Sequence, residues 1–223
     1  MAPVMKGVKE ILNILDSIGP VVATLLLFIN RKKLSREMYP ILIFCIIQLC
    51  CNTIATIIEK VFDGNNYWVY KINATTSFLC LSYLFLKKLF QISNIAFSLF
   101  LFVYAVINML LLFQGDGISQ FNSTSAAIES LAIVSFCLYF FYARLINTSE
   151  EISIPETSIF WCIVGIFTYY AGAFFIFISY KYLIHSDSAT VGILWRFHNI
   201  LLFICCAYIS YGVLCKNYRT ILS

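Results

Sequence analysis

Long apolar stretches separated by short polar connections dominate the chain. A membrane-spanning helix needs about 20 mostly apolar residues. Seven stretches meet this requirement, and the predicted helices cover residues 9–30, 39–60, 67–86, 91–113, 123–146, 158–180 and 190–214. The stretches are about twice as long as a barrel strand and do not alternate strictly between apolar and polar residues. The sequence therefore predicts an all-α, polytopic membrane bundle with seven transmembrane helices.

The predicted connections are too short to hold a soluble domain. The first runs from Arg31 to Glu37, the third is barely more than Lys87 and Lys88, and the sixth lies around His185. The two tails are short as well, and no internal repeat is visible. The whole chain, residues 1–223, is therefore expected to form a single seven-helix transmembrane domain.

The basic residues predict the orientation, because short cytoplasmic loops carry an excess of lysine and arginine. Nine such residues fall in the connections and tail on one predicted side, and five fall on the other. The two densest clusters, at 31–36 and 87–88, lie on the same side. With seven crossings, the C-terminus is predicted to be cytoplasmic and the N-terminus outside.

Composition supports a membrane environment and narrows the chemistry. Hydrophobic residues make up 61% of the chain and charged residues only 12%, against about 25% charged in soluble domains. The net charge of +4 is spread over separate loops, so nucleic acid is not an expected partner. Nine cysteines lie in or beside apolar runs without a C-x-x-C pair, and there are two histidines. The cysteines are expected to be small buried hydrophobes without disulfides, and neither a metal nor a cofactor is predicted.

Three segments carry a resemblance to a known group of proteins. They are 66–72 (NYWVYKI), 160–175 (FWCIVGIFTYYAGAFF) and 194–201 (LWRFHNIL). Together they resemble uncharacterised seven-helix inner-membrane proteins of Bacteroidota, some of which are associated with sensor-kinase genes. The resemblance implies a location in the cell inner membrane and a role in signalling. It implies no catalytic residue.

Polar side chains inside the predicted helices are the candidate functional residues, because they are costly in a bilayer unless paired or hydrated. The candidates for ligand binding are Asp16, Asn52, Glu59, Asn73, Glu129, Trp195, Arg196, His198 and Asn199. All fall in the predicted outer half of the bundle, which is the layout expected of an outward-facing polar cavity for a small-molecule or lipid ligand. The competing interpretation is that they join helices, with Arg196 paired to Glu129 or Asp16.

Two smaller patterns add to this picture. Trp195, His198 and Asn199 share one helix face, which suits a ligand contact or a proton-responsive group and equally suits a packed histidine. Gly165 and Gly172 lie seven residues apart, which predicts close helix packing.

No catalytic motif is present: the chain has no P-loop, no G-x-S-x-G and no H-E-x-x-H. Residues 190–214 contain no lysine, which excludes a retinal Schiff base of the rhodopsin type. The first hypothesis is a sensory or signalling receptor, or an accessory subunit, acting through a partner such as a sensor kinase. The alternatives are an intramembrane lipid-processing enzyme of the lysoplasmalogenase-like type, using Asp16 and Glu129, and a small-solute transporter.

Overall fold

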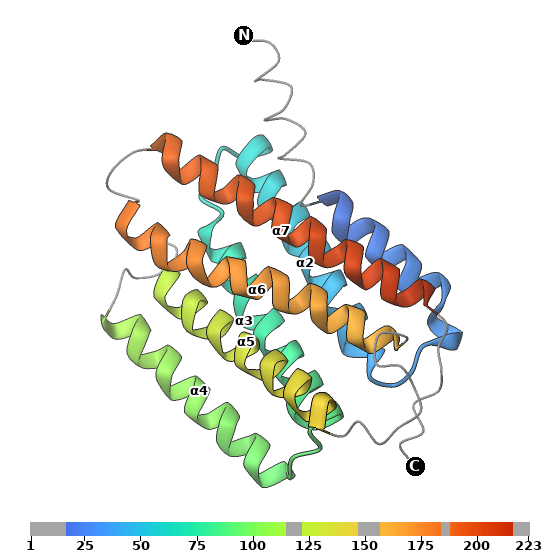
Figure 1. The fold of residues 1–223 in the computed structure, drawn as a ribbon. Helices are drawn as coiled ribbons and strands as arrows, with labels where there is room; N and C mark the ends of the chain where they lie inside the picture. The colour runs from blue at the N-terminus through green and yellow to red at the C-terminus, as the bar shows by residue number, and fades with distance from the viewer. Residues whose placement is uncertain (1–16, 115–121, 147–156, 184–187, 216–223) are drawn as a thin grey trace.

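The computed structural model describes residues 17–114, 122–146, 157–183 and 188–215 (Figure 1). Within these ranges the chain forms seven α-helical segments and no strand. A first helix covers Ser17–Ile29. It is followed by α2 (Met38–Val61), α3 (Tyr67–Ser82), α4 (Asn94–Gln114), α5 (Ser123–Ile146), α6 (Ser158–Leu183) and α7 (Ser188–Leu214). The expected all-α bundle is confirmed.

Five of the helices, α2, α4, α5, α6 and α7, are long and apolar enough to cross a membrane. These helices carry large apolar side chains that protein atoms cover only in small part. Ile95 is 82% exposed, Phe102 66% and Phe175 68%. Side chains of this kind need an apolar surrounding, which a bilayer supplies. The chain is therefore a helical membrane protein.

The apolar core joins six of the seven helical segments. Its fully buried side chains include Leu27 of the first helix, Phe44 of α2, Ile133 of α5, Ile163 of α6 and Ile209 of α7. By contrast, α4 has no buried residue between Asn94 and Leu111, and it lies at the edge of the bundle beside α5 (Figure 1). The position of α4 therefore depends on the few side chains that join it to the other helices.

Two glycines allow α6 and α7 to approach each other closely. A Cβ atom at Gly165 would lie 2.8 Å from the carbonyl oxygen of Cys205 and 2.9 Å from Cβ of Tyr208. A Cβ atom at Gly212 would lie 2.7 Å from the carbonyl oxygen of Ser158. Because real Cβ atoms do not approach so near, any larger residue would push the helices apart. Close packing at Gly165 is confirmed, and it takes the form typical of helix pairs in membranes.

The third connection differs from the expectation. Lys87 and Lys88 do not form the loop, because α3 continues into a π-helix over Tyr83–Leu89. The turn follows this π-helix, where Gln91 adopts a left-handed backbone with φ 53°. Lys87 Nζ stabilises the turn by donating to the Ile92 carbonyl oxygen at 2.8 Å and to Asn94 Oδ1 at 2.7 Å. A lysine in the last turn of a helix can thus donate hydrogen bonds to the following loop, which composition alone does not reveal.

Candidate functional site

Four of the candidate residues, Asn73, Glu129, Trp195 and His198, line one cavity within the described part of the chain. Asp16 lies outside these ranges. Asn52, Asn73 and Glu129 are buried, with 6%, 8% and 4% of their surface exposed. Trp195, Arg196, His198 and Asn199 are partly buried on α7. Glu59 is exposed near the C-terminal end of α2, so the structure does not bring it together with the buried candidates.

An amide and hydroxyl network joins α2 to α3. Gln48 Nε2 donates to Ser77 Oγ at 2.9 Å, and Asn73 Nδ2 donates to Gln48 Oε1 at 3.0 Å. Ser77 Oγ in turn donates to Asn73 Oδ1 at 3.2 Å. All three side chains are buried. Buried amides in an apolar environment require such partners, so this triad fixes the α2–α3 pair.

Glu129 of α5 is the buried carboxylate of the described part of the chain. Tyr104 Oη of α4 donates to Glu129 Oε1 at 2.7 Å, which is a short hydrogen bond. Ser125 Oγ lies 3.4 Å from the same oxygen and 2.9 Å from Asn108 Oδ1. These contacts attach the edge helix α4 to the bundle. Tyr104 and Asn108 were not among the sequence candidates, although their spacing of four residues on an otherwise apolar helix is a usable signal.

His198 of α7 belongs to an aromatic cluster. Its Nε2 atom lies 3.2 Å from Tyr169 Oη, and its ring contacts those of Tyr169, Phe177 and Trp195. The Trp195 ring also stacks on Tyr70 of α3, at 5.5 Å between centroids and 26° between planes. The other ring nitrogen, Nδ1, is buried and has no hydrogen-bond partner within the described residues. Such an atom favours a water molecule or a ligand group beside it.

These features enclose one cavity of about 40 Å³, bounded by α2, α3, α5, α6 and α7. One wall is polar, with Gln48, Asn73, Ser77, Glu129 and Ser130, and the other is aromatic. The aromatic wall consists of Tyr70, Tyr169, Tyr170, Phe177, Trp195 and His198. Because one water needs at least about 10–15 Å³ of such space, the cavity has room for a few waters. We call it the polar cavity.

A second, smaller cavity of about 10 Å³ lies on the α3–α5 side of Glu129. Lys71, Thr75, Asn122 and Ser125 line it together with Glu129. Ala74, Ala126 and Glu129 line both cavities, so the Glu129 side chain lies between them. Lys71 is therefore the cation that shares the surroundings of the Glu129 carboxylate.

Of the two expected partners of Arg196, Glu129 does not form the ion pair, and Asp16 lies outside the described residues. Glu129 bonds to Tyr104 and Ser125, whereas the Arg196 side chain extends past Gly192, with Nη1 3.6 Å from where a Cβ would stand there. Helix geometry explains this result. Successive residues are about 100° apart around a helix, so Arg196 is roughly opposite His198 when His198 faces the cavity. Neither Arg196 nor Asn199 lines the polar cavity.

Across the described ranges, no group of three or more His, Cys, Asp or Glu side chains is placed to hold a metal ion. A buried carboxylate facing aromatic rings can accept hydrogen bonds from a donor and can stabilise a positive charge. Fold and site together define the class as a helical membrane protein with an internal polar cavity between its helices. No protein-family model, curated protein or solved structure matches the chain.

Proposed function

We propose that this chain is a sensory or signalling receptor, or the accessory subunit of one, with seven spans in the cell inner membrane. The first helix and the continuous α3–π-helix segment supply the two spans beyond the five long helices. The N-terminus lies outside, the C-terminus lies in the cytoplasm, and the polar cavity belongs to the outward-facing half. The lysine and arginine distribution supports this orientation.

The observation that carries the proposal is the buried Glu129 carboxylate on the wall of a cavity that five helices share. A ligand in contact with five helices can favour one arrangement of them over another, which is the physical requirement for signalling. Its chemistry follows from the walls: a small molecule with a cationic or hydrogen-bond-donating group for Glu129 and an apolar part for the aromatic rings. Since the cavity measures about 40 Å³, such a ligand enters only if the helices move, and this links binding to a conformational change.

The cytoplasmic connections are too short to act on a substrate by themselves, so the signal passes to a partner. A sensor kinase or another membrane signalling protein fits this role. Gene neighbourhood offers a simple check: an adjacent sensor kinase or regulator favours the receptor, whereas a lipid-metabolism operon favours the enzyme.

The test uses a carboxylate-to-amide change that preserves shape. In a deletion strain, Glu129→Gln should accumulate like the wild type, because glutamine still accepts the Tyr104 hydrogen bond. It should nevertheless fail to restore the wild-type transcript profile. The matched control, Glu59→Gln, removes an exposed carboxylate of α2 and should restore the profile fully. Full restoration by Glu129→Gln would contradict a functional role of the charge.

The same strains separate the receptor from the lipid-processing alternative. An enzyme predicts that a lipid substrate accumulates in the deletion strain and disappears when wild-type protein is returned. A receptor predicts no such substrate in lipid extracts.

A further inference from the structure

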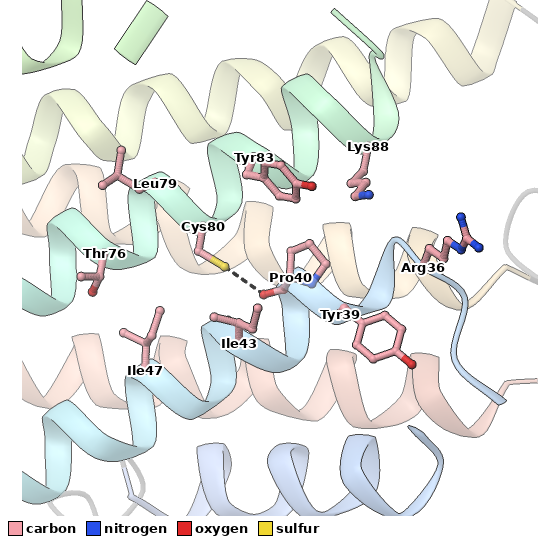
Figure 2. Close-up of a pocket in the computed structure, with 10 residues that line it drawn as sticks. All are labelled: Arg36, Tyr39, Pro40, Ile43, Ile47, Thr76, Leu79, Cys80, Tyr83 and Lys88. Carbon is pink, nitrogen blue, oxygen red and sulfur yellow. Dashed lines mark hydrogen bonds between the residues drawn. The ribbon is translucent and has the colours of Figure 1, made fainter. Parts of the chain in front are cut away.

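A second concave feature lies outside the polar cavity, between α2 and the α3–π-helix segment. It is an open groove of about 610 Å³, and it shares no residue with the polar cavity. Its walls come from side chains of α2 such as Ile43 and Ile47, and from Leu79 of α3 (Figure 2). At the base of the groove, Cys80 Sγ donates to the Pro40 carbonyl oxygen at 3.1 Å and joins the two helices. The groove has the volume of a typical pocket for a small organic molecule.

The polarity of this groove changes along its length. Arg36 and Lys88 lie at one end, and Thr76, Ile47 and Leu79 lie toward the other (Figure 2). Tyr39 and Tyr83 stand next to the two cations, and Lys88 Nζ lies 5.5 Å from the centre of the Tyr83 ring. The groove thus has two aromatic rings and two cations at one end and apolar side chains along the rest. This pattern is typical of the membrane boundary, where lipid headgroups meet acyl chains.

Within the described residues, no carboxylate forms an ion pair with either cation of the groove, Arg36 or Lys88, and Lys88 lies beside the Tyr83 ring. The neighbouring Lys87 differs, because its amino group is engaged by the turn after the π-helix. Arg36 lies in the turn just before α2 and Lys88 lies in the π-helix, and both line the same groove, so an anionic group bound there would be attracted by both.

The length of the groove matches one half of a bilayer. From Met38, where α2 begins two residues after Arg36, nine helical steps lead to Ile47, which corresponds to about 14 Å of helix. The apolar core of a bilayer is about 30 Å thick, so the groove runs from the membrane boundary to near the midplane. A ligand with an anionic head and one long acyl chain fits both the charge and the length.

We propose that this groove binds an anionic phospholipid of the cytoplasmic leaflet, with the phosphate between Arg36 and Lys88 and an acyl chain along Ile43, Ile47 and Leu79. The leaflet assignment rests on the orientation given with the proposed function, whereas the binding chemistry does not. A bound lipid between α2 and α3 would stabilise the pair that also carries Gln48 and Asn73. The groove is therefore a place where membrane composition acts on the polar cavity.

The experiment measures lipid binding by native mass spectrometry of the purified full chain in detergent. The probes are phosphatidylglycerol and phosphatidylcholine with identical dioleoyl chains. The wild type should retain phosphatidylglycerol in preference to phosphatidylcholine. Because one basic residue near a membrane surface contributes about a factor of five, Arg36→Gln together with Lys88→Gln should weaken phosphatidylglycerol binding about 30-fold.

Two further variants make the result specific to the groove. Arg31→Gln with Lys32→Gln removes one arginine and one lysine, both exposed and on the same predicted side, and should leave the preference intact. Leu79→Trp fills the channel and should weaken binding of both lipids. Equal binding of the two lipids by the wild type would overturn the proposal without any variant, as would an unchanged preference in the Arg36/Lys88 variant. Because the measurement is made in detergent, its outcome is independent of orientation and of receptor activity.

Discussion

Replacing Gly165 with alanine is expected to lower the thermal midpoint of the purified protein, whereas the same change at Gly192 is not. At Gly165 the added Cβ would stand 2.8 Å from the Cys205 carbonyl oxygen and 2.9 Å from Tyr208 Cβ. Neither atom is the flexible end of a side chain, so α6 and α7 must separate. Overpacking of this kind costs about 1–3 kcal/mol, and each kcal/mol corresponds to roughly 2–4 °C in a chain of this size.

Gly192 is the matched control because it is also a helical glycine of the bundle. The nearest atom to an added Cβ there is Arg196 Nη1 at 3.6 Å, an ordinary contact. Alanine is favoured over glycine within a helix by about 1 kcal/mol, so Gly192→Ala should be neutral or stabilising. The thermal midpoint of each variant is measured from the folded fraction that size-exclusion chromatography detects after heating. Equal midpoints for the two would contradict the close α6–α7 contact.

Replacing Glu129 with leucine is expected to reduce the folded fraction by loosening α4. The change removes the acceptor of the Tyr104 hydroxyl and the neighbour of Ser125. Since α4 has no buried residue between Asn94 and Leu111, its remaining attachments include the ring contacts of Phe100 and Tyr104 and the bond from Ser125 to Asn108. Hydrogen bonds between membrane helices contribute about 0.6–1.7 kcal/mol, and an abandoned buried donor adds to this cost. We expect roughly a 3- to 30-fold shift toward the unfolded state.

A double-mutant cycle identifies the cause of this loss. If the Tyr104 hydroxyl is the abandoned group, Tyr104→Phe combined with Glu129→Leu should recover part of the stability lost in Glu129→Leu alone. Glu129→Gln should stay near the wild type, because its amide oxygen still accepts the bond. Strictly additive effects of the two substitutions would show that the hydrogen bond does not hold α4.

Much of the helical architecture could be predicted from the sequence, because the length of an apolar run is what a bilayer selects. The helix expected over 123–146 begins at Ser123 and ends at Ile146. The end of α3 could not be predicted, since charged residues usually mark a loop. Here Lys87 lies inside the π-helix and reaches the turn with its amino group.

For the candidate site, the position of a residue along its helix could be predicted from the sequence, but the neighbours that its side chain contacts could not. Position along a helix sets depth through the 1.5 Å rise per residue, so Asn73, Glu129 and His198 could be expected near one another, and they line the same cavity. Which neighbour each side chain meets depends on how the helices are rotated and packed. Arg196 was therefore paired wrongly with Glu129, and Tyr104 was missed because tyrosine is frequent in this chain, with 14 copies.

The central claim is a polar cavity that is hydrated from outside the cell. Thiol-specific thiosulfonates react with the thiolate, which forms in water and not in hydrocarbon, so labelling reports hydration. The background variant replaces the four cysteines with exposed surface by serine, namely Cys50, Cys51, Cys80 and Cys215. The five buried cysteines remain, because their removal would disturb the core.

The most direct measurement introduces single cysteines at Thr75, which lines the small cavity, and at Ala126, which lines both. Ile133→Cys in the apolar core is the control. A small, membrane-impermeant cationic thiosulfonate is applied to intact cells, and the folded protein is analysed by mass spectrometry. The account predicts labelling at residue 75, slower labelling at residue 126 and none at residue 133. Labelling of neither cavity position, or labelling only when the reagent is given access to the cytoplasmic side, would contradict it.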